Sequence, residues 1–140
     1  MILNYYFDTE LTNTLIGTFK PDWTWADYVD TIYQIDKDPA NHAIPIESRI
    51  DQIIDFRDAL KLPDDGVGVL QLQKVREQIK TNKEIPRSGG ISVFVGNPIW
   101  TASFLRTVGS TISQATVKEH TFPTIEKARD YIIQHRAKSS

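Results

Sequence analysis

The stretch Ile91-Ser92-Val93-Phe94-Val95-Gly96-Asn97-Pro98 holds the clearest strand in the chain, together with the signal that ends it. Residues 91–95 are β-branched or aromatic except for one serine, which is typical of a strand. Gly96-Asn97-Pro98 then stops the strand, because these residues favour turns and proline cannot donate to a strand ladder. This segment predicts a strand followed by a turn and a new element.

Downstream of this strand the apolar pattern changes to helical spacing. The apolar positions that predict a helix are Phe104, Leu105, Val108 and Ile112. Thr116 to Phe122 is a more polar segment, predicted as a strand suited to a sheet edge. Pro123-Thr124 opens the last predicted helix, whose apolar face carries Ile125, Ala128 and Ile132.

Upstream of residues 91–95 lie another strand and another helix. Ile50 to Phe56 contains the pair Ile53-Ile54, which is typical of a strand covered on both faces. A helical stripe then follows the turn residues 62–66 and consists of Val69, Leu72, Val75 and Ile79. Each strand is thus followed by a helix.

The N-terminal segment has the pattern of a hairpin. Ile2 to Phe7 and Leu11 to Phe19 are both extended in pattern, and Asp8-Thr9-Glu10 supplies a turn between them. The two strands are therefore predicted to pair antiparallel.

A helix start follows the hairpin. Thr24 is a good N-cap, and Asp27 lies three residues later, which is close to a capping box. The apolar stripe of this helix is Trp25, Tyr28, Val29, Ile32 and Tyr33. Trp23 precedes the cap and is interpreted as an apolar staple, although an exposed Trp23 would instead indicate a contact surface.

The predicted order is β-β-α-β-α-β-α-β-α. Strands that alternate with helices imply an α/β fold with a mostly parallel mixed sheet and helices packed on it. A single domain is expected over residues 1–136, with residues 137–140 as a flexible polar tail.

The composition excludes several classes of function. With 40% hydrophobic and 24% charged residues the chain fits an ordinary globular domain. It has no cysteine, so disulfides, thiolate metal sites and a cysteine nucleophile are excluded. The net charge of -2 gives no bias toward nucleic acid or anionic lipid. Because no signal peptide and no membrane-length apolar run is found, we expect a cytoplasmic protein without a membrane span.

The order of these landmarks resembles the STAS superfamily, which includes the anti-sigma-factor antagonists and a broad group of small bacterial STAS-like proteins. The resemblance rests on an ordered set of three stretches and spans nearly the whole chain. They are Gly17-Thr18-Phe19 with Trp23-Thr24-Trp25-Ala26-Asp27-Tyr28, Ile53-Ile54-Asp55-Phe56-Arg57-Asp58, and Phe122-Pro123-Thr124-Ile125-Glu126-Lys127-Ala128. The resemblance implies a non-enzymatic domain that binds a protein partner.

One property of the family does not carry over. In the antagonists, a Ser or Thr after the third strand is phosphorylated, and this switches partner binding. Here residues 55–63 contain no hydroxyl side chain, and none occurs before Val69. Asp58 has two interpretations. It could supply a fixed negative charge where a phosphate would sit, or it could be a turn or cap residue.

The loops after two neighbouring strands form the candidate site. In open parallel sheets, ligands favour the carboxyl ends of the strands, so these loops should share one rim. The candidate residues for a partner or ligand are Asp55, Arg57, Asp58, Gly96, Asn97, Trp100 and Arg106. Trp100 could anchor an apolar group, with an arginine for charge, or it could pack against the neighbouring helix.

Other patterns that could carry chemistry are weak. His42, His120 and His135 are not at metal-ligand spacing, so no metal site is expected. The glycines of Gly66-x-Gly68 and Ser88-Gly89-Gly90 lack the context of a phosphate-binding loop, and no cofactor is expected.

Three hypotheses follow for function. The first is a non-enzymatic STAS-like module that binds a protein partner. The alternative is a small-molecule or lipid-binding domain with an apolar pocket between helix and sheet. The third is an enzyme that uses Asp55 or Asp58 as a base. A homodimer formed through Thr116 to Phe122 or an exposed helix face is a further hypothesis.

Overall fold

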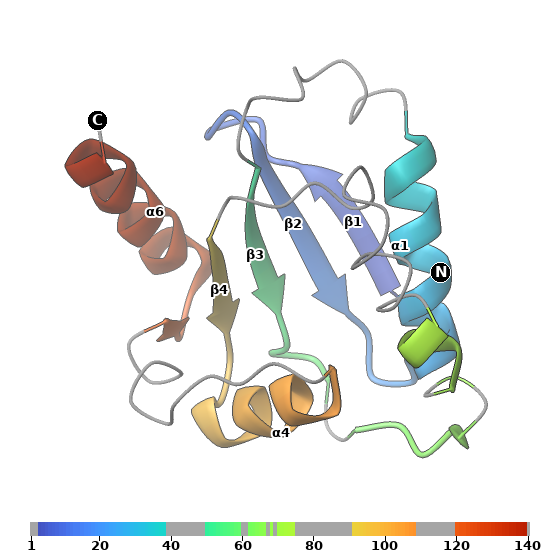
Figure 1. The fold of residues 1–140 in the computed structure, drawn as a ribbon. Coiled ribbons are helices and arrows are strands. Elements are labelled where there is room, and N and C mark those ends of the chain that lie inside the picture. The colour runs from blue at the N-terminus through green and yellow to red at the C-terminus, as the bar shows by residue number, and fades with distance from the viewer. Residues whose placement is uncertain are drawn as a thin grey trace.

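A computed structural model describes residues 3–38, 50–59, 62–66, 68, 70–74, 91–108 and 120–139. The α/β class is confirmed, since a five-stranded mixed sheet has helices packed on it (Figure 1). The strands are β1 (Leu3–Phe7), β2 (Thr14–Phe19), β3 (Asp51–Asp55), β4 (Ser92–Val95) and β5 (Thr121–Phe122). The helices are α1 (Trp25–Lys37), α4 (Pro98–Val108) and α6 (Ile125–Ser139), and residues 66, 68 and 70–74 are also helical.

The strands lie in the sheet in the order in which they occur in the chain, β1-β2-β3-β4-β5. β1 pairs antiparallel with β2, and the other neighbours pair parallel. Side chains of α1 and α4 pack on one face of the sheet, and side chains of α6 pack on the other.

The two faces of the sheet carry two separate cores. Alternation along β4 shows the separation, because Val93 and Val95 belong to the core under α6 while Phe94 belongs to the core under α1 and α4. Ile53 is fully buried on the α6 side and Ile54 packs on the α1 side, so the prediction of a strand covered on both faces is confirmed.

The start of α1 is fixed by the predicted cap. Thr24 Oγ1 accepts a hydrogen bond from the Asp27 backbone at 3.1 Å, and Asp27 Oδ2 accepts one from the Thr24 backbone at 3.0 Å. Asp65 adds a second cap that the sequence did not predict, because its carboxylate accepts from the backbone N–H groups of Trp25 and Ala26. Gly68 lies so close to this corner that a Cβ would collide with Ala26 and Trp25.

Three boundaries differ from the predicted ones. β2 begins at Thr14 rather than Leu11, because residues 8–13 form a longer turn that the bond from Asp8 N to Thr14 O closes at 2.8 Å. Asn13 takes a left-handed φ of 53°, which asparagine tolerates. The last helix runs through Ser139, so residues 137–139 are helical. Of the predicted edge strand, only Thr121–Phe122 is described as a strand, and residues 116–119 lie outside the described part.

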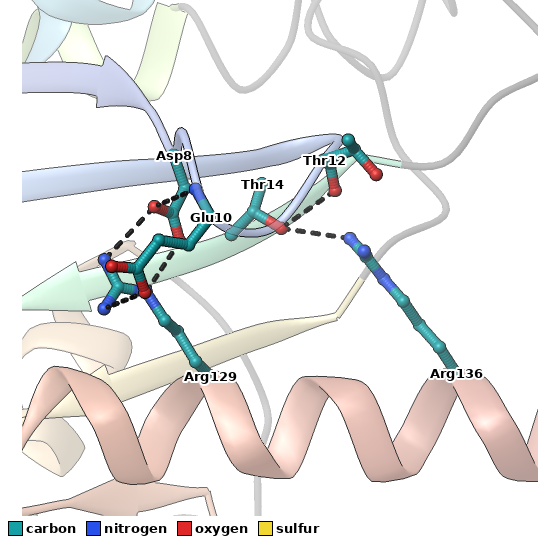
Figure 2. Close-up of polar contacts among 6 residues, drawn as sticks. All are labelled: Asp8, Glu10, Thr12, Thr14, Arg129 and Arg136. Carbon is teal, nitrogen blue, oxygen red and sulfur yellow. Dashed lines mark hydrogen bonds and ion pairs between the residues drawn. The ribbon is translucent and has the colours of Figure 1, made fainter.

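Buried ion pairs attach α6 to the hairpin end of the sheet (Figure 2). Arg129 Nε contacts Asp8 Oδ2 at 2.7 Å, and Arg129 Nη1 contacts the exposed Glu10 at 3.1 Å. Nearer the C-terminus of α6, Arg136 donates to Thr14 Oγ1 at 3.0 Å and to Asp51 Oδ2 at 2.8 Å. The two arginines are seven residues apart and therefore project from the same face of α6.

Candidate functional site

A cluster of aromatic side chains fills the carboxyl ends of the parallel strands. Phe19 ends β2, Phe56 follows β3 directly, and α4 lies across these strand ends (Figure 1). Phe19 and Phe56 pack edge to face, with 4.9 Å between their ring centroids. Trp23 is buried against Phe19 and Trp25, which agrees with a packing role and excludes an exposed contact surface.

An open hollow of about 620 Å³ lies beside this cluster and is called the rim hollow. Its volume is within the range of roughly 300–1,000 Å³ that is usual for ligand sites. The residues that define it are Phe56, Arg57, Leu62, Gly96, Asn97 and Trp100. The loops after β3 and β4 thus share one rim, and four of the seven candidate residues line the hollow.

The loop after β4 is built to turn the chain sharply into α4. Gly96 has a φ of 140°, and its N–H donates to the carbonyl of Phe122 at 3.0 Å. Asn97 caps the helix, because its Oδ1 accepts from the Ile99 N–H at 2.8 Å and its carbonyl accepts from Thr101 N at 3.0 Å. Gly96 and Asn97 therefore position Trp100 as well as line the hollow.

Asp55 does not face the rim hollow as a free carboxylate. Its side chain is 6% exposed and is held by Arg57, whose Nε and Nη2 donate at 3.0 and 2.8 Å. The Arg57 backbone N–H donates to the same carboxylate at 3.0 Å. This hydrogen-bonded pairing raises the pKa of Arg57 above its usual value. Asp55 is thus a positioning residue that fixes a half-exposed guanidinium at the rim.

Asp58 and Arg106 lie near the hollow without lining it. Asp58 is exposed, in a turn that the bond from Ala59 N to Phe56 O closes at 3.0 Å. This placement favours the interpretation of Asp58 as a turn residue. Arg106 is exposed in the last turn of α4.

Trp100 has one packed side and one side toward the hollow. Its ring centroid lies 4.1 Å from that of Phe56, and its indole N–H is buried with no hydrogen-bond partner among the residues described. The preceding residue, Ile99, is 73% exposed. A buried N–H group without a hydrogen-bond partner lowers the stability of the folded protein.

Some lining residues were missed by the sequence analysis. Phe56 and Leu62 were assigned only to a strand and a turn, and Ile99 was not singled out. Ile99 carried a usable signal, because it is an apolar residue off the apolar stripe that Phe104 and Leu105 define.

The described ranges contain no metal-binding group. No group of three or more His, Cys, Asp or Glu side chains there could hold a metal ion. His120 Nε2 lies 2.8 Å from the Tyr131 hydroxyl, and the His135 ring stacks on Tyr131, while His42 is outside the described residues. The described lining of the rim hollow contains no carboxylate, so neither Asp55 nor Asp58 is placed there as a base.

None of the helices in the described ranges is both long enough and apolar enough to cross a membrane.

Comparison with known protein families finds no family that matches the chain, and no curated protein matches it in sequence. The resemblance to STAS domains therefore rests on the three stretches of sequence named above.

Proposed function

We propose that this protein is a non-enzymatic, STAS-like binding module that takes a segment of a protein partner in the rim hollow. The observation that carries the proposal is the convergence of the loops after β3 and β4 on one open hollow with a tryptophan wall and a fixed arginine. The mixed sheet with an N-terminal antiparallel hairpin is compatible with the STAS-like class.

The lining defines the chemistry of the partner segment. Phe56, Leu62 and Trp100 offer apolar surface, and the exposed Ile99 adds to this lining. Arg57 is the single charged side chain in the described lining, and its guanidinium is held in place by Asp55. We therefore expect a segment with an apolar anchor next to an acidic residue, because tryptophan and arginine are the side chains that most often dominate such interfaces.

The fixed negative charge that Asp58 could provide is a separate part of the proposal. Asp58 is exposed beside Arg57 and adds to the electrostatic stabilisation of its charged form. In the STAS-like interpretation, Asp58 would take the place of a phosphate and keep the module permanently competent for binding.

A site-specific crosslinking experiment tests the proposal. A photoreactive amino acid at Ile99 should capture one discrete partner in a lysate of the source cells, and the same group at Ile133 of α6 should not. Both side chains are exposed, at 73% and 50%, so the pair is matched for accessibility.

The purified partner then provides the quantitative test. Ile99→Asp and Arg57→Ala should each weaken its binding by about tenfold or more, while Ile133→Asp should leave the affinity unchanged. Equal capture at both positions, or full affinity in Ile99→Asp, would refute the rim hollow as the binding site.

A further inference from the structure

A second cavity lies between α1 and the first three strands, and we call it the α1 pocket. Its volume is about 250 Å³. The β2 side is formed by Leu15, Gly17 and Phe19, and the α1 side by Tyr28, Ile32 and Ile35. The α1 pocket is separate from the rim hollow except that both adjoin the aromatic cluster.

Gly17 creates the floor of the α1 pocket. Alternation places Gly17 on the same face of β2 as Leu15 and Phe19, and its neighbours across the strands are Tyr5 and Ile54. A Cβ at Gly17 would meet no atom within 4 Å. A glycine inside a strand is unfavourable and often marks close approach of another group. Here no described protein atom makes that approach.

The lining is polar at a few points but carries no net charge. The Thr31 hydroxyl is buried and donates to the Asp27 carbonyl at 2.8 Å, which leaves its oxygen free to accept a hydrogen bond. Burial raises the pKa of Tyr28 to about 12, so its phenol stays neutral at physiological pH. No lysine or arginine lines the pocket in the described part of the chain.

The size and polarity together define a ligand class. An apolar cavity of about 150 Å³ is sufficient for benzene, so the α1 pocket has room for one ring with a short substituent. An anionic ligand would be buried without a cation, at a high desolvation cost. A neutral ligand with one hydroxyl or N–H group could donate to Thr31.

We propose that the α1 pocket binds a neutral, single-ring aromatic molecule with one hydrogen-bond donor, in the class of simple phenols. This inference does not depend on the rim hollow or on a protein partner. The proposed small-molecule site lies on the face of the sheet that α1 covers.

Calorimetric titration with p-cresol tests the proposal. The wild-type protein should bind p-cresol with a dissociation constant of about 1 mM or lower. Gly17→Val places a branched side chain on the pocket floor and should weaken binding by about tenfold or more, with an unchanged or higher melting temperature. Gly66→Val is the matched control, because Gly66 is exposed and a Cβ there also meets no atom within 4 Å. The affinity of Gly66→Val for p-cresol should equal that of the wild type.

A replacement variant and a control ligand complete the test. If Gly17→Val does not fold, as judged by circular dichroism, Gly17→Ala replaces it and should weaken binding by about threefold. Benzoate, an anionic ring of similar size, should not bind to the wild type. Absence of p-cresol binding, equal binding by the Gly17 variants and the wild type, or benzoate binding as tight as that of p-cresol would each overturn the proposal.

Discussion

The two faces of the sheet are packed with different kinds of side chain. Under α6 the core is aliphatic, and its six buried members are Ile16, Ile53, Val93, Val95, Ala128 and Ile132, each 0% exposed. Under α1 and α4 the core is aromatic and includes Phe19, Trp23, Trp25, Phe56, Phe94 and Phe104. Both the rim hollow and the α1 pocket adjoin the aromatic core.

The difference shows where binding can occur on this fold. Both hollows are lined from the α1 and α4 side of the sheet or from its strands and loops, and no described residue of α6 lines either of them. The edges of the aliphatic face are further closed by arginines that neutralise Asp8 and Asp51. We therefore expect the α6 face to determine stability and the aromatic face to determine binding.

The largest expected effect concerns the ion pair at the hairpin end of the α6 face. Arg129→Ala should lower the free energy of unfolding by about 3 kcal/mol, because it leaves the buried Asp8 carboxylate without a countercharge. Glu10→Ala removes the other partner of the same arginine. Glu10 is 70% exposed, so this change should cost less than about 1 kcal/mol. Urea unfolding of both variants measures the difference, and equal losses would contradict the assignment of the stabilisation to the buried Asp8–Arg129 pair.

Two glycines of the aromatic face should respond in opposite directions to the same substitution. Gly96→Ala should destabilise the protein by about 2 kcal/mol, because its φ of 140° is strained for any residue with a Cβ. Gly17→Ala should stabilise it by about 0.5–1 kcal/mol, because its Cβ enters open space and alanine loses less backbone entropy on folding. Thermal unfolding of the two variants measures the sign of each change in stability. A destabilised Gly17→Ala would argue against open space above β2.

The pH dependence of stability should also originate on the α6 face. Burial alone would raise the pKa of Asp8, but hydrogen bonds and the charge of Arg129 outweigh burial and lower it below 3.8. The folded-state pKa is thus lower than the unfolded one, so the stabilisation is complete above about pH 4 and is lost as the pH falls through the folded-state pKa. Urea unfolding between about pH 4 and pH 2 should show a shallower loss of stability for Asp8→Asn than for the wild type. Parallel curves would contradict this assignment.

The smallest expected effect on stability is at the rim of the aromatic face. Asp58→Asn should change the free energy of unfolding by less than about 0.5 kcal/mol, since Asp58 is exposed in a turn. Its effect on partner binding separates the two interpretations of this residue. Unchanged affinity for a partner captured at Ile99 would reject the fixed-charge proposal, and weaker binding would support it.

The rim was partly predictable from the sequence and partly not. Arg57, Gly96, Asn97 and Trp100 line one hollow as the strand-end rule predicts. Asp55 was predicted for the same edge but lies on the α6 side of β3 and is neutralised by Arg57. The direction of a side chain at the end of a strand depends on register, and register is set by the neighbouring strands.

Several elements follow from local signals in the sequence. Strand β4, the Thr24–Asp27 capping box and strand β3 with its pair Ile53-Ile54 each depend on residues within one turn or one strand. Periodicity and capping act over such short distances, so no knowledge of the rest of the chain is needed.

Contacts between distant residues, in contrast, follow from the packing of whole elements. Arg129 and Asp8 are 121 residues apart in the chain, and Asp65 caps a helix that begins 40 residues before it. The space above Gly17 is bounded by side chains of α1 and of the neighbouring strands. Such contacts and gaps arise from the packing of whole elements, which local sequence patterns do not encode.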